Sequence, residues 1–423
     1  MRILLTATAS YVPPRGGATR SNLVWLDQLG GAGHECRIVC GALAEDEEKR
    51  RQLQEEEIAA RPAAAEEGIE VLTRGPIVVY AVEDPARRIR VLRRQIREFG
   101  PDWVLVSSED LGHALLREAH AASAGHVVYL AHTPQFFPFG AASWNPDRQT
   151  AEVAAQSAGV VAIGRHMGEY IERSLGRPAA VIHPPIYGRG PFRNYGNFER
   201  GLITMINPCA VKGISIYLDV ARQLPQYEFG AVPGWGTTSA DRRALAQVSN
   251  VRLLANTRDI DEVLAGTRIL LMPSLWYEGF GLIVMEAMLR GIPVVSSDSG
   301  GLREAKRGTG YVIPVRPMDR FLPEFDERGM PRPEMVENDA GPWVATLREL
   351  LSDREAYDRE SAVSRKVAHE FIAGLDARAM ERFLSTLVAP NPAARSAQGT
   401  IESLTPERRA LLLERLRKRR MAQ

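Results

Sequence analysis

Two glutamates eight positions apart, Glu278 and Glu286, are the residues of this 423-residue chain whose type and spacing point most directly to chemistry. A carboxylate accepts hydrogen bonds from hydroxyl groups, such as those of a sugar or a ribose. Eight residues make roughly two helical turns, so the second carboxylate returns to the side of the first. Taken alone, this spacing is typical of an exposed helix glutamate near a turn, and the surrounding sequence must decide.

The neighbouring residues predict a strand, a loop, a helix and a second strand. Residues 268–272 are a short apolar run that stops at Pro273, as a strand buried on both faces does. A loop with Gly279 and Gly281 leads into an apolar helix over 282–289, and Gly291-Ile-Pro ends that helix before a strand from Val294. In such a unit a ligand binds beyond the carboxyl ends of the strands, so the Glu278 loop and residues 299–301 are expected to border it.

The whole string, Pro-Ser before Glu278, Gly-Phe-Gly after it, and Gly-Ile-Pro-Val-Val and Gly-Gly further on, resembles the donor-site signature of retaining GT-B glycosyltransferases. That family includes sucrose-phosphate and trehalose synthases. The resemblance implies an α/β GT-B fold, with two Rossmann-like domains facing a cleft and a C-terminal helix crossing back. It divides the chain into an acceptor domain (1–190), a donor domain (191–372), the crossing helix (373–390) and a linker with a basic amphipathic tail (391–423).

The resemblance also assigns roles around the donor. Glu278 and the backbone after it orient the sugar, and Glu286 binds the ribose hydroxyls. Lys212 matches the family's diphosphate-binding lysine, whereas Asn207 stands where the family usually has an arginine, so one charge contact is missing. The donor-binding segment after Glu278 consists of Gly279, Phe280, Gly281 and Leu282.

Two features of the first half extend this site. Gly16 and Gly17 follow the first strand, Arg2 to Thr6, and would expose N–H groups at a helix start to a diphosphate. His132 ends a strand before a Pro and an aromatic cluster, and in the family a histidine of this region lies near the transferred sugar. The cluster either walls an acceptor cleft or is core beneath a long loop; it consists of Phe136, Phe137, Phe139 and Trp144.

Composition limits the alternatives. A formal net charge of +1 gives no argument for nucleic acid as a partner. No apolar run reaches the roughly 18 residues of a membrane span, and no secretory signal opens the chain, so a cytoplasmic protein is expected. Cys36, Cys40 and Cys209 lack the spacing of a disulfide or a metal site. No cofactor or metal is expected, since Asp259-Ile-Asp261 precedes a helix and is explained by N-capping.

The other segments give coarser expectations. Alternating strands and helices predict a parallel, doubly wound sheet. Residues 44–65 are expected to form a solvated helix or connection, and residues 316–341 a connection without periodicity. Helices over 343–351 and 356–380 close the fold. The basic helix near the C-terminus is expected to be a solvated, partly ordered helix, with contact to anionic lipid or docking on a partner as the alternatives. Residues 404–416 are similar to segments that open condensation domains, and this similarity suits docking on a megasynthase in a natural-product pathway.

The sequence therefore predicts a metal-independent glycosyltransferase that moves a hexose-type sugar from a nucleotide sugar to an acceptor hydroxyl with retained configuration. Three alternatives remain open. A sugar-nucleotide epimerase and a phosphorylase also use GT-B folds, although no phosphorylase cofactor machinery is found. A degenerate GT-B scaffold docking through the basic tail is favoured by the missing arginine and opposed by intact Glu278, Glu286 and Lys212.

Overall fold

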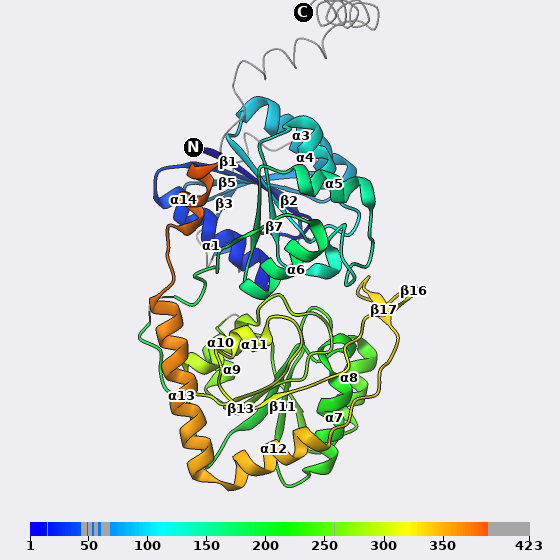
Figure 1. The fold of residues 1–423 in the computed structure, drawn as a ribbon, viewed down its shortest axis with the longest axis vertical. Coiled ribbons are helices and arrows are strands. Elements are labelled where there is room, and N and C mark those ends of the chain that lie inside the picture. Colours follow the sequence, from blue (N-terminus) through cyan, green and yellow to red (C-terminus); the bar gives the residue numbers. More distant parts are fainter. Residues whose placement is uncertain are drawn as a thin grey trace, which may run out of the picture.

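A computed structural model of the chain describes residues 1–14, 16–43, 49, 53–54, 58–60, 68–188, 190–257 and 259–387. Each of two large sheets forms the centre of one domain, and the two domains lie one above the other (Figure 1). The chain passes from the first sheet to the second between Val181 and Leu202. The predicted α/β fold with two Rossmann-like halves is confirmed.

The sheet of the first domain has nine strands in the order β3-β4-β5-β2-β1-β6-β7-β8-β9. Its core strands β1, β6, β7 and β8 are almost wholly buried, which explains their continuous apolar sequences. The strands are β1 Arg2–Thr6, β2 Glu35–Gly41, β3 Ala59–Ala60, β4 Ile69–Arg74, β5 Ile77–Val82, β6 Trp103–Ser107, β7 Val127–Ala131, β8 Gly159–Ala162 and β9 Ala180–Val181. The helices are α1 Gly17–Gly31, α3 Pro85–Phe99, α4 Ala114–Ala122, α5 Arg148–Gln156 and α6 Arg165–Leu175.

The prediction of a purely parallel sheet was wrong at one edge. Strand β4 runs antiparallel to both β5 and β3, while the other pairs of this sheet are parallel. Only Gly75 and Pro76 separate β4 from β5, and Gly75 has a φ of +50°. Two residues can form a hairpin turn, but they are far too few for the crossover that a parallel pair requires.

The sheet of the second domain is parallel throughout, in the order β12-β11-β10-β13-β14-β15. All six residues of β13 are buried, and α10 covers the predicted residues, so the strand, loop, helix and strand around Glu278 are confirmed. The strands are β10 Leu202–Ile206, β11 Phe229–Val232, β12 Val251–Leu253, β13 Thr267–Met272, β14 Val294–Ser297 and β15 Val312–Ile313. The helices are α7 Ile214–Gln223, α8 Ser239–Ala246, α9 Ile260–Leu264, α10 Leu282–Leu289, α11 Leu302–Ala305 and α12 Gly341–Ser352.

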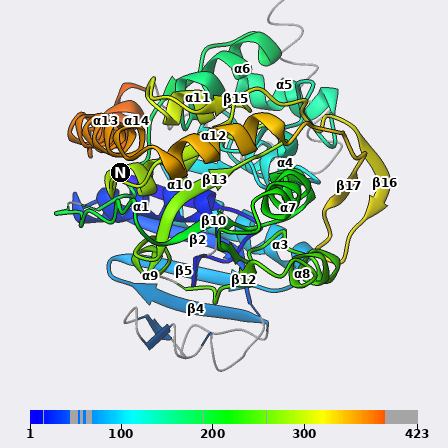
Figure 2. The ribbon, with the colours of Figure 1, turned by 90° about the horizontal axis from the view of Figure 1, so that it is seen from below.

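Residues 316–341 contain an element that the sequence analysis did not predict. Strands β16 (Phe321–Phe325) and β17 (Pro331–Pro333) form an antiparallel hairpin that projects at the side of the molecule (Figure 2). A two-stranded ribbon tolerates prolines because each strand has an unpaired edge, where no backbone N–H is needed for pairing. Phe321 packs edge-on against Trp144 of the first domain, with ring centroids 5.2 Å apart, so the hairpin reaches across the gap between the domains.

The chain crosses back to the first domain near its described end. Helix α13 (Arg354–Ala373) packs along α10 in the second domain, and the shorter α14 (Ala379–Thr386) packs against α1 (Figure 1). Within the described part of the predicted crossing segment, residues 373–387, the chain leaves α13 at Ala373 and forms the eight-residue α14. The basic tail, residues 391–423, lies outside the described residues, as does most of 44–65. Among the described helices, none is long and apolar enough to span a membrane.

The carboxylate of Glu304, in α11 of the second domain, joins the two domains. It accepts hydrogen bonds from the backbone N–H groups of Arg165 (3.0 Å) and His166 (2.9 Å) at the start of α6, and it contacts Nε2 of His183 at 3.0 Å. Burial alone would raise the pKa of Glu304, but the bonds from His183 and from the two N–H groups lower it to about 2. The second domain therefore caps a helix of the first.

We expect Glu304→Gln to lower the thermal unfolding midpoint at neutral pH, because an amide makes weaker bonds to these donors, at a cost of about 1–3 kcal/mol. The folded-state pKa lies below the unfolded value, so the stabilisation is present above a pH of about 4.3 and is lost as the pH falls toward about 2. The difference from wild type, measured by scanning calorimetry, should shrink over that range. Glu324→Gln, at an exposed ion pair with Arg332, is the control. A difference that stays constant with pH would contradict this role.

Candidate active site

A cleft of about 470 Å³ lies between the two domains. Ala7 after β1, His132 after β7 and Asn207 after β10 place it at the carboxyl ends of both sheets, the edge where α/β sheets bind ligands. Residues 299–301, which were also expected to border the ligand, are not among the residues that line this cleft, and the N–H of Gly301 bonds to the carbonyl of Glu278 at 2.8 Å. The residues that the sequence analysis assigned to donor binding, and His132, all line the cleft. These residues are Gly16, Gly17, His132, Asn207, Lys212, Glu278, Gly279, Phe280, Gly281, Leu282 and Glu286.

Two helices, one from each domain, begin at the cleft. Gly16 precedes α1 with a φ of +89°, and Gly281 precedes α10 with a φ of +106°, which a glycine adopts without strain. Neither glycine has a side chain to bind the N–H groups of the first turn. The two starts lie against each other, since a Cβ added to Gly17 would come within 2.9 Å of Leu282 Cδ1. Two helix N-termini side by side favour an anion between them.

Lys212 and Glu278 form an ion pair inside the cleft. The same Glu278 oxygen accepts a hydrogen bond from the Ser274 hydroxyl, and both charged side chains are about nine-tenths buried. The Lys212 ammonium also lies 4.4 Å from the centre of the Trp276 ring, a cation–π contact. A positive charge is therefore held in place beside a carboxylate that still has a second oxygen for a ligand.

Asn207 does not replace the arginine that the resemblance implied at its position. Its Oδ1 accepts a hydrogen bond from the N–H of Gly236 at 2.9 Å, and its backbone has a φ of +57°, which asparagine tolerates better than most residues. Its buried Nδ2 has no hydrogen-bond partner in the described part of the chain. Asn207 thus supports the loop after β11 and brings no charge to the cleft.

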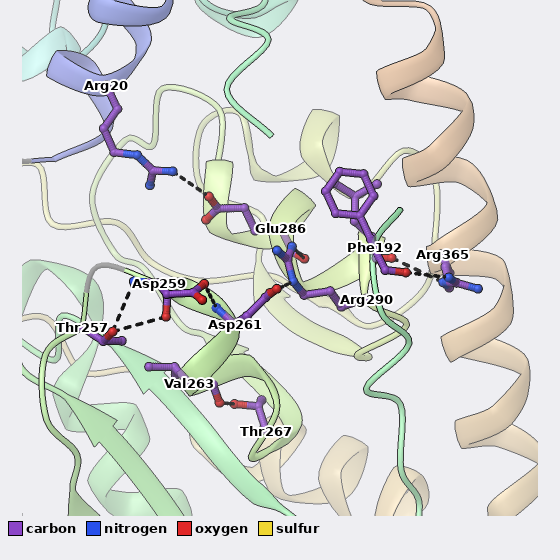
Figure 3. A network of polar contacts seen from close by, with 11 residues as sticks. Arg20, Phe192, Thr257, Asp259, Asp261, Val263, Thr267, Glu286, Arg290 and Arg365 are labelled. Carbon is purple, nitrogen blue, oxygen red and sulfur yellow. Dashed lines mark hydrogen bonds and ion pairs between the residues drawn. The ribbon is translucent and has the colours of Figure 1, made fainter. Parts of the chain in front are cut away.

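Glu286 is bound by an arginine that the sequence analysis did not identify. Arg20, on the first turn of α1, contacts Glu286 at 3.2 Å across the cleft (Figure 3). The Glu286 side chain is 7% exposed and that of Arg20 46% exposed. Burial raises the pKa of Glu286, and the neighbouring Arg20 opposes that rise.

The Asp259-Ile-Asp261 segment caps a helix, as predicted. The Asp259 carboxylate accepts a bond from the N–H of Asp261 at 2.9 Å at the start of α9, and Asp261 pairs with Arg290 (Figure 3). Within the described residues, no group of three or more His, Cys, Asp or Glu side chains is arranged to hold a metal ion.

His132 is held by a chain of buried hydrogen bonds. Asn22 donates from its amide nitrogen to Tyr11 (2.8 Å) and to Ser107 (2.9 Å), so its carbonyl oxygen faces His132 and accepts from Nε2 at 2.7 Å. Nε2 therefore carries the proton and Nδ1 keeps its lone pair. Burial lowers the pKa of His132, so the ring is neutral near pH 7. Nδ1 is buried and has no partner in the described part of the chain, so it is an unused hydrogen-bond acceptor beside the cleft.

The aromatic residues after His132 take both of the roles that the sequence left open: some are core beneath the loop, and one lines the cleft. Phe137 and Phe139 are buried and pack together as core beneath the loop, with ring centroids 5.1 Å apart. Phe136 lines the cleft and packs edge-on against Trp144. Trp144 also contacts Trp276 of the second domain.

Comparisons with known proteins agree with this geometry. Residues 15–187 match the family model described as Glycosyltransferase Family 4, and residues 202–322 match the one described as Glycosyl transferases group 1. The two matches fall one in each domain and together span well over half of the chain. The chain is a GT-B glycosyltransferase by fold and by family match.

Solved structures similar to this glycosyltransferase share its fold at low sequence identity. HepE of Anabaena, in complex with UDP-glucose, has a TM-score of 0.63 at 15% identity, over 91% of this chain and 100% of that one. Sucrose-phosphate synthase of Thermosynechococcus elongatus has a TM-score of 0.63 at 13% identity, over 90% and 97%. WaaG, involved in lipopolysaccharide biosynthesis, has a TM-score of 0.60 at 13% identity, over 92% and 100%.

A curated relative is similar over a short stretch. An uncharacterized 42.6 kDa protein in the cps region of Klebsiella pneumoniae is 31% identical over 96 residues. That stretch is 23% of this glycosyltransferase and 26% of the relative.

The packing of the glycosyltransferase at the cleft requires that Gly279 has no side chain. A Cβ there would lie 2.3 Å from the carbonyl oxygen of His132, so backbone would have to move. We expect Gly279→Ala to destabilise the protein by about 1–3 kcal/mol and to weaken ligand binding. Gly31→Ala is the matched control, because a Cβ on Gly31 meets nothing within 4 Å. Thermal midpoint and nucleotide affinity measure both effects, and equal results for the two variants would refute the close contact.

Proposed function

We propose that this glycosyltransferase moves a hexose-type sugar from a nucleotide-sugar donor to a hydroxyl group of a small-molecule or natural-product acceptor, with retention of anomeric configuration. The observation that carries the proposal is that Lys212, Glu278, Glu286 and His132 line one cleft at the carboxyl ends of two sheets. The fold similarity to HepE, solved with UDP-glucose, supports a nucleotide sugar as donor.

Each part of the cleft suits one part of such a donor. Lys212 and the first-turn N–H groups of α1 and α10 bind the diphosphate, because they are its positive and donor groups. Glu286 accepts hydrogen bonds from the ribose hydroxyls. Glu278 and the backbone of residues 279–282 orient the sugar, and His132 accepts a sugar or acceptor hydroxyl through Nδ1.

The reaction that we propose is a front-side displacement. The bond between the anomeric carbon and the donor phosphate oxygen breaks, and a bond from that carbon to the acceptor oxygen forms on the same face. The acceptor proton passes to the departing phosphate oxygen. Lys212 and the helix N-termini stabilise the charge that develops on the diphosphate, which is their main contribution to rate. With this charge supplied by the protein, the reaction is proposed to need no metal.

The acceptor end of the cleft is proposed to lie beyond Lys212. Phe136, Trp235 and Trp276 line the cleft there, and Trp235 is 47% exposed with its ring 5.5 Å from that of Trp276. Aromatic faces suit the flat carbon face of a sugar or of an aglycone.

The first test is binding of UDP, GDP, ADP and dTDP to the purified protein. We expect one of them to bind, and we expect Glu286→Ala and Lys212→Ala each to weaken it by roughly tenfold or more, since each removes a charged hydrogen-bond partner. Arg148→Ala, at a side chain 93% exposed, should leave affinity unchanged. If no nucleotide binds, with EDTA or with added metal, the donor-site proposal fails and a scaffold role gains support.

A second test separates chemistry from binding. His132→Ala should lower donor turnover by about tenfold or more while nucleotide affinity stays within about twofold, because His132 is proposed to contact the sugar and not the nucleotide. His126, buried at the opposite end of the same strand β7, provides the matched control. His126→Ala should leave turnover per folded molecule unchanged. A parallel loss of nucleotide affinity in His132→Ala would mean that His132 only supports the structure.

A further inference from the structure

Arg20 and Glu286 pair across the cleft although both are needed elsewhere once a donor binds. In the proposed function, on which this inference depends, Glu286 accepts the ribose hydroxyls. A buried carboxylate requires partners for its charge, and in the structure described here Arg20 is one of them, at 3.2 Å. When ribose hydroxyls supply those hydrogen bonds, Glu286 no longer needs Arg20.

Arg20 stands close to where the diphosphate is proposed to bind. It lies on the first turn of α1, three residues after Gly17, and its N–H bonds to the carbonyl of Gly16. That turn rests against the start of α10, where the two helix N-termini favour an anion. The Arg20 side chain is also 46% exposed, so it has room to change its partner.

The charges of the cleft make a second cation necessary. A nucleoside diphosphate brings at least two negative charges, and Glu109, Glu278 and Glu286 already line the cleft. Among the described lining residues, Lys212 and Arg20 are the two with a lysine or arginine side chain. Lys212 is paired with Glu278, and Asn207 is neutral and bound to Gly236. Arg20 is therefore the cation available for the second phosphate.

We propose that Arg20 is a diphosphate-binding residue that exchanges partners. On donor binding its guanidinium leaves Glu286, whose carboxylate turns to the ribose, and binds phosphate oxygens through two N–H groups. The planar guanidinium suits such paired bonds better than an ammonium does. Because Arg20 belongs to the first domain and Lys212 to the second, the diphosphate is bound from both sides of the cleft.

The test compares ligands that differ only in phosphate. With the base that binds the wild type, the affinities of the nucleoside, the monophosphate and the diphosphate are measured for wild type, Arg20→Ala, Arg20→Lys and Glu286→Gln. Arg20→Ala should weaken the diphosphate by about tenfold or more and leave the nucleoside within about twofold. Arg20→Lys should recover part of the loss. Glu286→Gln should weaken all three ligands alike.

Four results would overturn the proposal. An equal loss for nucleoside and diphosphate in Arg20→Ala would make Arg20 a positioning residue for Glu286. Unchanged diphosphate affinity would remove Arg20 from the binding site. Arg93→Ala, which breaks an exposed ion pair with Glu118, should match the wild type, and a similar loss there would point to a general charge effect. If the wild type binds none of the four diphosphates, the proposed function fails first and the role of Arg20 with it.

Discussion

The carboxylate of Glu304 is bound by donors of the opposite domain, and the shape of the cleft depends on it. Its contacts with Arg165, His166 and His183 set α11 against the start of α6. Gly164 completes this contact, because a Cβ on it would lie 3.1 Å from both Glu304 and Phe280. Together with the contact of Trp144 with Trp276, this docking holds the facing edges of the two sheets, and so the residues that meet across the cleft, in position.

Two buried carboxylates in the cleft, those of Glu278 and Glu286, each form an ion pair with a cationic side chain. Glu278 has Lys212 from its own domain, and Glu286 has Arg20 from the other. A buried ion pair contributes little net stability, because desolvation offsets its attraction. In this cleft such pairs hold charged groups in fixed orientations, so a charged ligand can bind to them without a large rearrangement of side chains or solvent.

Most residues of the donor-binding side of the cleft could be predicted from the sequence, because the sequence patterns that mark them are local. The apolar run before Pro273, the glycines around Phe280 and the spacing to Glu286 all act within one strand, loop and helix. Arg20 was missed because it meets Glu286 from 266 residues away, and no local pattern marks that contact. The antiparallel β4 had a usable signal, since Gly75-Pro76 is too short for a crossover. The hairpin of β16 and β17 had none, because prolines and charges interrupt its alternation.

Helix α14 packs in the first domain, although it lies far from the rest of that domain in the sequence. Phe383 lies over Gly159, where a Cβ would come within 2.6 Å of its ring, and Glu381 contacts His34 at 3.1 Å. Met380 and Leu384 are buried in the same core as α1. The first domain is therefore discontinuous, and the second is inserted within it. A fragment that ends after the first sheet and before the second would expose the apolar surface that α14 covers, so the first domain can be completed only after the chain has been synthesised through α14.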